Sequence, residues 1–278
     1  MQVGGPVLYA LFVWWFSTGL IIWLDNLPQR TFRWSMLGGT VVFLVSMYRL
    51  GAGSGDASDM GAYAAFTYAV LAWGWHEMAF FMGYITGTRR TACPDGCRGW
   101  AHFGHGVQAC LWHELAILAT AGVIVWVGWG APNQVGTWTF MVLWAGRTSA
   151  KLNFFFGVRN LGEEFLPPQL TYLKSFFRRR AMNPLMPVSV ALGLVWLAWL
   201  AGQGNPGTLR GVGLTFVITM LALAVIEHVV LVLPLPFAKL WGWAVSKRAA
   251  RVTRRAPAVC SADHIHLAPE RKRAAATL

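Results

Sequence analysis

Residues 62–81 read AYAAFTYAVLAWGWHEMAFF, and this stretch decides the fold. Its twenty residues are almost all apolar, which is the length that an α-helix needs to cross a membrane core of about 30 Å. His76 and Glu77 interrupt it near one end. An ionisable side chain inside a membrane span costs about 2.5–3.5 kcal/mol on insertion scales, and such side chains usually face a bundle interior or a cavity. The stretch therefore predicts a membrane helix that points polar groups at its neighbours.

Six further stretches have the same character. The seven predicted spans are residues 3–24, 34–50, 60–85, 105–130, 136–156, 185–202 and 208–233. Gly and Pro punctuate the connections between them. We expect an all-α polytopic membrane bundle of about seven transmembrane helices.

The composition fits a membrane protein. Hydrophobic residues make up 56% of the 278 residues and charged residues only 12%, against about 25% charged in soluble domains. Sixteen Trp suit aromatic belts at the two membrane surfaces. The net charge of +12 could suggest nucleic acid, but the cations lie in the loops and tail between apolar runs. We interpret them as topology signals and contacts to anionic lipid, and expect no nucleic-acid partner.

The cations are distributed on one side of the predicted spans. Of the 23 Lys and Arg, 19 lie in the loops after the first, third and fifth spans and in the segment after the seventh. Arg49 and Arg210 lie on the opposite side, and two more lie inside a span. Positive loops stay in the cytoplasm. This distribution predicts an inner-membrane protein with a periplasmic N-terminus and a cytoplasmic C-terminus.

Two segments outside the spans carry further predictions. Leu170, Leu173 and Phe176 recur at helical spacing after a prolyl pair, so an amphipathic helix at about 169–180 should lie at the cytoplasmic interface or pack on the bundle. Residues 247–278 are basic and poor in large apolar side chains, which predicts a disordered cytoplasmic tail after a membrane domain of residues 1–246.

Polar side chains of four spans fall at one predicted depth. With a rise of about 1.5 Å per residue, the residues that represent the four spans lie roughly 8–13 Å from the cytoplasmic ends of those spans: His76, His113, Lys151 and Glu227. We name this set the polar layer, and its members are His76, Glu77, His113, Glu114, Arg147, Lys151, Asn153, Glu227 and His228.

Two readings of the polar layer stay open. Three carboxylates and two cations could pair with one another and serve only to stabilise the bundle. Alternatively the layer binds a ligand or pigment. His76, His113 and His228 could hold a transition metal, but neighbouring His and Glu do not match the Glu-x-x-His pattern of di-iron bundles. A neutral His could also ligate the central ion of a bacteriochlorophyll or a precursor tetrapyrrole, which we prefer to a transition metal.

Two loops deserve a functional reading. The segment after residue 156 is Gly-rich and mixed in charge, and we expect it to cap the layer on the cytoplasmic side through Arg159, Asn160, Glu163 and Glu164, with Arg159 paired to one of the two acids. Cys93, Cys97, His102 and His105 have a loose zinc-like spacing. The alternative for that loop is a plain turn at residues 94–96.

Several segments carry a family resemblance. WHEMAFFMGYITG at 75–87, CPDG at 93–96, HELA at 113–116 and KLNFFFGVRNLGEEFLPPQLTYLKSF at 151–176 resemble the photosynthetic complex assembly protein 2 family (PuhE type) of phototrophic bacteria. The likeness runs from about residue 6 to residue 241 and is densest at 147–187. The tail after residue 247 lies outside it.

The resemblance implies a function in photosynthesis. It suggests an inner-membrane protein that supports bacteriochlorophyll supply and the assembly of reaction centre and light-harvesting complexes, with their subunits or pigment-synthesis enzymes as partners. It assigns no catalytic residues. The sequence contains no nucleophile triad, Walker loop or dinucleotide fingerprint, so we expect binding rather than catalysis. The alternatives are a membrane metalloenzyme acting on a pigment or isoprenoid precursor and, with less support, a small transporter.

Overall fold

Helices form the whole architecture of the part of the chain that the structure describes. The computed structural model describes residues 3–202, 211–233 and 237–244, and within them β-structure is limited to one isolated bridge between Val158 and Arg179. The α-helices are α1 (Gly4–Asp25), α2 (Phe32–Ala52), α3 (Asp59–Phe81), α4 (Gly99–Val127), α5 (Val135–Phe156), α6 (Leu185–Gly202) and α7 (Gly211–Val232). Short 3-10 helices are η1 (Gln29–Thr31), η2 (Glu163–Phe165), η3 (Pro168–Phe176) and η4 (Phe237–Trp241).

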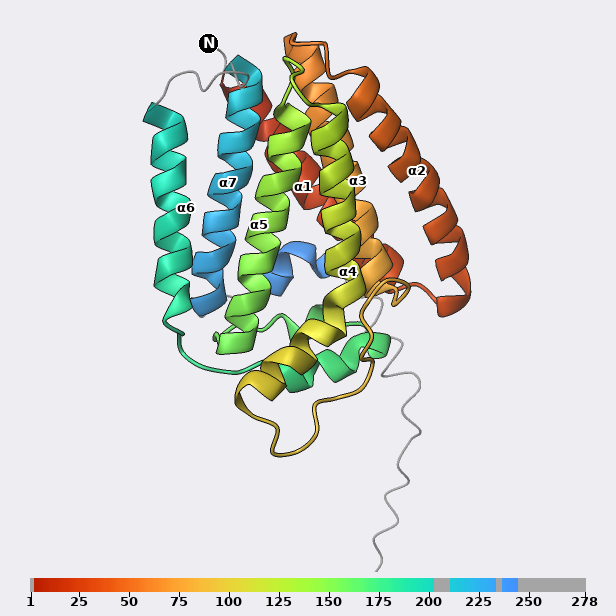
Figure 1. Cartoon of the computed structure of the whole chain (residues 1–278), viewed down its shortest axis with the longest axis vertical. Helices are drawn as coiled ribbons and strands as arrows, with labels where there is room; N and C mark the ends of the chain where they lie inside the picture. The colour runs from red at the N-terminus through yellow and green to blue at the C-terminus, as the bar shows by residue number, and fades with distance from the viewer. Residues whose placement is uncertain (1–2, 203–210, 234–236, 245–278) are drawn as a thin grey trace, which may run out of the picture.

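The long helices run up and down beside one another as a bundle (Figure 1). The predicted all-α class is confirmed. Five helical segments of the described residues are long and apolar enough to cross a membrane: α1, the stretch from η1 through α2, α4, α6 and α7. This is compatible with a multi-pass membrane protein.

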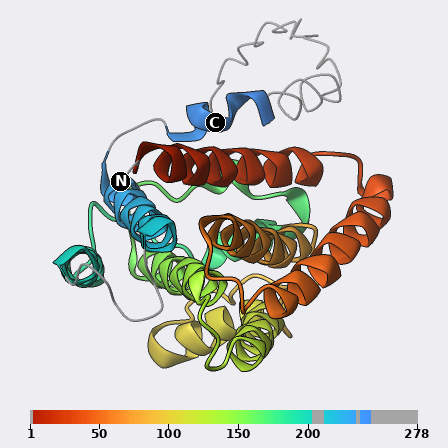
Figure 2. The ribbon, with the colours of Figure 1, turned by 90° about the horizontal axis from the view of Figure 1, so that it is seen from above.

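The remaining two long helices are α3 and α5, and α5 is half-buried against α3, α4, α6 and α7. Helix α3 contacts α1, α2, α4, α5 and α7, and Figure 2 shows it enclosed by its neighbours. Helix α3 carries Glu77, and α5 carries Arg147 and Lys151, which lowers the hydropathy of both helices. Charged residues inside a bundle are tolerated where neighbouring helices supply their partners.

Aromatic and small side chains fill the core between these helices. The rings of Phe66 and Phe216 stack at a centroid separation of 4.4 Å and join α3 to α7. Phe140 of α5 is fully buried against Trp73 of α3 at 5.5 Å. Aromatic pairs of this kind contribute about 0.5–1.5 kcal/mol beyond area burial. These contacts place α3, α5 and α7 in a fixed arrangement around the polar layer.

Helix α4 begins at Gly99, six residues before the predicted start, and its ribbon changes direction in Figure 1. The connection from α3 runs along the bend. The backbone N–H of His113 donates to the carbonyl of Thr86 at 2.9 Å, and the N–H of Arg89 donates to the carbonyl of Gln108 at 3.2 Å. A side chain at Gly87 would collide with the backbone around Gln108. The connection therefore needs glycine there to lie against the helix.

The amphipathic helix predicted at about 169–180 is present as a shorter helix. The segment is the 3-10 helix η3, which stops at Phe176, and the chain then extends to pair Arg179 with Val158. Leu170, Leu173 and Phe176 are buried against Phe80 and Ala109 of the bundle. The apolar face thus packs on protein, the alternative that the spacing left open. Residues 245–278, which include the predicted tail, lie outside the described residues, as does the predicted start of the last span at 208–210.

Candidate functional site

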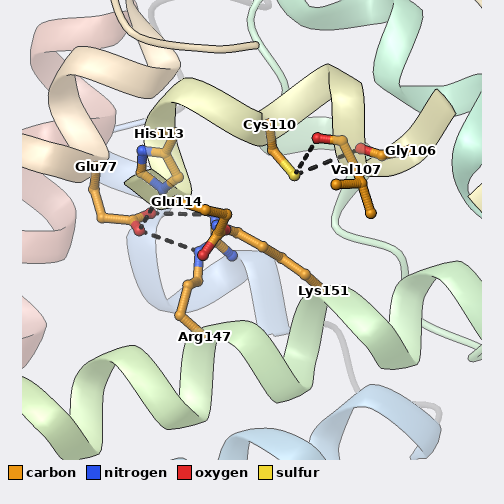
Figure 3. Close-up of polar contacts among 8 residues, drawn as sticks. All are labelled: Glu77, Gly106, Val107, Cys110, His113, Glu114, Arg147 and Lys151. Carbon is orange, nitrogen blue, oxygen red and sulfur yellow. Dashed lines mark hydrogen bonds and ion pairs between the residues drawn. The ribbon is translucent and has the colours of Figure 1, made fainter. Parts of the chain in front are cut away.

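An ion pair between α3 and α5 forms the centre of the polar layer (Figure 3). Arg147 donates through Nε to Glu77 Oε1 at 3.2 Å, and its Nη2 lies 3.1 Å from Oε2. Such two-pronged contacts are the strong and geometrically specific form of the arginine–carboxylate pair. The Glu77 side chain is 12% exposed and that of Arg147 26%. The predicted pairing of opposite charges is present here.

His113 of α4 faces the same carboxylate. Its Nε2 lies 4.0 Å from Glu77 Oε1, beyond hydrogen-bond distance, and its ring packs on Phe80 at a centroid separation of 4.5 Å. The residue has no exposed surface, and neither ring nitrogen has a hydrogen-bond partner among the described residues. More than nine in ten buried polar groups are partnered in folded proteins. His113 is therefore a buried group with unused hydrogen-bonding or ligand capacity.

A second ion pair lies one turn further along α5. Lys151 Nζ is 2.5 Å from Glu114 Oε1 of α4, and it also sits over the Phe80 ring at 5.6 Å. The two side chains are 21% and 25% exposed. Figure 3 shows Arg147, Lys151 and Glu114 between the two helices. This part of the layer reaches the surface of the bundle between α4 and α5.

Helix α7 contributes a separate arm. His228 is hydrogen-bonded at both nitrogens: Nδ1 lies 2.7 Å from the Ala224 carbonyl and Nε2 2.8 Å from Ser149 Oγ. Because a carbonyl only accepts, Nδ1 carries a proton and donates it to Ala224. Trp14 of α1 donates to Glu227 Oε1 at 3.1 Å. The adjacent residues of this pair thus point to different helices.

The first pair diverges in the same way. His76 is buried and its Nε2 lies 2.9 Å from Thr120 Oγ1 of α4, with the Trp75 ring edge-on at 5.0 Å. Glu77 turns instead toward Arg147. A step of about 100° per residue makes this divergence unavoidable on a helix.

Asn153 belongs to a structural cluster rather than to the charged centre. It donates to Ser189 Oγ of α6 at 3.2 Å and accepts from Asn183 Nδ2 at 3.0 Å. Asn183 Oδ1 in turn accepts from the backbone N–H of Leu185 and Met186, at 2.9 and 3.2 Å. This cluster fixes the end of α5 to the start of α6.

The predicted cytoplasmic cap is built differently from expectation. Glu163 contacts Lys174 at 3.4 Å and Arg179 at 3.5 Å, instead of the predicted Arg159, which is exposed. Asn160 caps the C-terminal end of α7, because its Nδ2 donates to the carbonyls of Val230, at 2.6 Å, and Leu233. The side chain of Glu164 lies outside the described residues.

The predicted metal ligands of the layer do not converge. His76, His113 and His228 each have the separate surroundings given above. In the described parts of the chain, the residues whose ligand atoms gather as a metal-sized group are Cys93, Cys97 and His102, in the connection between α3 and α4. Desolvation and the neighbouring Cys97 raise the pKa of the Cys93 thiol.

Several polar residues around the layer escaped the sequence analysis. Asp25 at the end of α1 is 8% exposed, and its Oδ1 has no partner in the described structure; it reads as a boundary residue because it follows an apolar run. Trp144 Nε1 and Thr148 Oγ1 are likewise buried without described partners. Trp144 lies three residues before Arg147 and Thr148 three residues before Lys151, and this helical spacing is the signal that could have found them.

Comparison with known proteins gives one family and one relative. A family model described as protein of unknown function (DUF3623) matches residues 1–252. A protein of Rhodobacter capsulatus, described as an uncharacterized 30.4 kDa protein in the puhA 5′ region, is 39% identical over 248 residues, which cover 85% of this chain and 88% of the relative. No solved structure gives a significant match. The chain belongs to the DUF3623 family.

Proposed function

We propose that this protein is a seven-span inner-membrane factor of the photosynthetic complex assembly protein 2 type (PuhE type). It supports the assembly of reaction centre and light-harvesting complexes and the supply of bacteriochlorophyll to them. The location of the relative in the puhA 5′ region supports this, because it fits a photosynthesis gene cluster. The five apolar helical segments and the enclosed position of α3 support a membrane bundle.

The observation that carries the proposal is the partly exposed charge between α4 and α5. Arg147 is nine residues from the end of α5, about 14 Å along the helix, and keeps 26% of its side chain exposed. Glu114 keeps 25%. Charged groups at this depth are expensive against lipid and are normally covered by protein. A transmembrane segment of a nascent pigment-binding subunit, offering polar groups to this surface, satisfies that requirement.

Direct ligation of a tetrapyrrole by His113 is supported by chemistry but not by space. An unpartnered imidazole nitrogen is a suitable ligand for the central ion of such a pigment. The ring is fully buried on Phe80, however, and leaves no open face for a macrocycle. We therefore assign the exposed side of the layer to a protein partner and route no pigment step through His113.

Photo-crosslinking in a phototrophically grown host tests the partner surface. A photoreactive residue at Leu118, one turn from Glu114 and 45% exposed, should capture a reaction centre or light-harvesting subunit. The matched control is Leu44 of α2, which is 60% exposed but lies away from the layer. Equal capture at both positions, or capture of no photosynthetic subunit at Leu118, would contradict the proposal.

A charge-neutral double variant tests the function. Glu114→Gln with Lys151→Gln should lower the near-infrared absorbance of pigment-protein complexes in membranes while the variant still accumulates. Lys174→Gln, in the exposed pair with Glu163, should leave that absorbance unchanged. Normal complex levels in the double variant would sink the assignment of this surface.

A further inference from the structure

A group of thiol and imidazole side chains lies away from the polar layer, in the connection between α3 and α4. The ligand atoms of Cys93, Cys97 and His102 all lie within 4.8 Å of one another. Cys93 Sγ is 3.1 Å from His102 Nδ1. His105 Nδ1 completes the group, at 3.6 Å from Cys93 Sγ and 3.3 Å from Cys97 Sγ.

Local structure explains how these four residues meet. Cys97 N–H donates to the Pro94 carbonyl at 3.2 Å, and Gly96 has a φ of 77°. A positive φ at the third position is the requirement of a type II turn, which glycine meets without strain. The turn brings the two thiols back to the same side. His102 and His105 stand three residues apart on the first turns of α4, where they share a face.

The distances have the dimensions of a tetrahedral zinc site. With Zn–S near 2.3 Å and Zn–N near 2.0 Å, sulfur and nitrogen ligands of one ion lie about 3.5 Å apart. The three measured sulfur–nitrogen distances of 3.1, 3.3 and 3.6 Å bracket that value. In a two-iron cluster with two His and two Cys ligands, the histidines bind one iron and the cysteines bind the other. The sulfur and nitrogen ligand atoms would then lie further apart than they do here.

We propose that Cys93, Cys97, His102 and His105 bind one structural Zn²⁺ ion. Two thiolates and two imidazoles fill all four positions of a tetrahedral ion, which is the arrangement of a structural rather than a catalytic zinc site. Cys93 and Cys97 are both free thiols and partly buried. The site lies on the face predicted to be cytoplasmic, where thiols remain reduced and available to metal. This assignment is independent of the proposed function of the polar layer.

The surroundings show what the ion would hold in place. The N–H of Cys93 donates to Ser175 Oγ of η3 at 2.9 Å. The His102 ring packs between Phe155 of α5 and Phe176 of η3, at 5.1 and 5.7 Å. The zinc would therefore fasten the connection after α3 to the start of α4, next to η3 and the end of α5. It would clamp the connection between α3 and α4 onto the first turns of α4, beside η3.

Metal analysis of the whole protein tests the site directly. Protein purified in mild detergent through a non-chelating affinity tag should contain one zinc per chain by inductively coupled plasma mass spectrometry. Cys93→Ser and Cys97→Ser should each lose most of it. Cys110→Ser is the matched control, because that thiol contacts the Gly106 carbonyl outside the group, and it should retain its zinc.

Wild-type protein decides the matter even where a variant fails to accumulate. Wild-type protein without zinc and with reactive thiols at 93 and 97 would show simple thiol–imidazole hydrogen bonds and overturn the proposal. A disulfide between these two cysteines, or stoichiometric iron instead of zinc, would overturn it equally. A second readout is trypsin cleavage at Arg90 and Arg98, which flank the thiols. Strong chelation should accelerate it, and unchanged cleavage after zinc removal would refute the clamp.

Discussion

Glu77 can be buried because Arg147 meets it with two contacts, and this dependence can be measured. Replacing Arg147 by Met leaves the carboxylate without its counter-ion. Breaking a buried pair in this way destabilises by about 3–5 kcal/mol. We expect a lower midpoint of thermal unfolding in detergent, with partial recovery in a Glu77→Met and Arg147→Met double variant. Lys174→Met, from an exposed pair worth less than about 1 kcal/mol, is the control. An equal fall in the thermal midpoint of the Arg147→Met and Lys174→Met variants would contradict this account.

His113 presents the opposite case, a buried polar side chain without a described partner. An unsatisfied buried group costs about 1–3 kcal/mol, so His113→Leu should raise the thermal midpoint. His228→Leu should lower it, because both His228 nitrogens are hydrogen-bonded. If His113 is kept for function, the more stable variant should also support lower levels of pigment-protein complexes. A destabilised His113→Leu protein would mean that the imidazole has a partner.

At the scale of residues, the sequence predicted that opposite charges of the polar layer would pair, but not which residues would meet. Glu77 and Arg147 were identified because they are charged residues inside apolar stretches. Helix geometry required the side chains of His76 and Glu77 to point in different directions. The rotation of each helix was not predictable, because it depends on packing such as the Phe66 and Phe216 stack. Asp25 was missed because it follows an apolar run and lies just after the predicted end of the span.

The close packing of the connection after α3 against α4 needs a glycine at position 87. Gly87→Ala places a methyl group against the backbone at Gln108, and neither backbone can yield cheaply. Overpacking of this kind typically costs about 1–3 kcal/mol. Gly104→Ala is the control on α4 itself, since nothing lies within 4 Å of the added carbon, and it should stabilise the helix by roughly 0.5–1 kcal/mol. Thermal unfolding of both proteins should show shifts of opposite sign.

Asn183 starts α6 and also ties it to α5. Its carbonyl oxygen caps the helix while its amide nitrogen reaches Asn153 and, at 2.9 Å, the Gly157 carbonyl. Asn183→Ala should cost at least the roughly 0.5–2 kcal/mol of a lost N-cap. Asn183→Asp keeps the cap but loses the donors, so it should fall between Ala and wild type in thermal unfolding. An Asp variant as unstable as Ala would show that the donors, and not the cap, dominate.

At the scale of elements, the pattern of apolar residues predicted where the helices lie. It did not predict whether their apolar faces pack on lipid or on protein. The boundaries of α1, α2, α5 and α6 fall within two residues of prediction. The start of α4 was missed because residues 99–104 include two glycines and a histidine. For η3 the spacing of apolar residues correctly indicated an apolar face. The same spacing suits contact with lipid or with protein, and in the structure this face packs on the bundle.

Seven spans require that α3 and α5 both cross the membrane, and reporter fusions test each of them separately. Alkaline phosphatase fused after Gly55 or Ala131 should be active, and fused after Arg90 or Lys174 inactive, with fluorescent-protein fusions giving the inverse pattern. If α3 did not cross, the fusions at 55 and 90 would report the same side. If α5 did not, those at 131 and 174 would agree.

At the scale of the molecule, the overall class followed from hydropathy and charge, whereas long-range gatherings did not. The zinc-like group illustrates this. Its spacing in sequence is loose, and the four residues meet because a turn at Gly96 and the first turns of α4 bring them together. Linear spacing alone underestimates such a site.

The two residues of the ion pair at the centre of the bundle are synthesised at different times. Seventy residues separate Arg147 from Glu77 along the chain. At about 5–20 residues per second, the counter-ion is synthesised on the order of 10 s after the acid that needs it. During that interval α3 can neither satisfy Glu77 nor bury its weakly apolar surface. We therefore expect stable insertion of α3 to depend on the later arrival of α5, with the two helices inserted together rather than one by one.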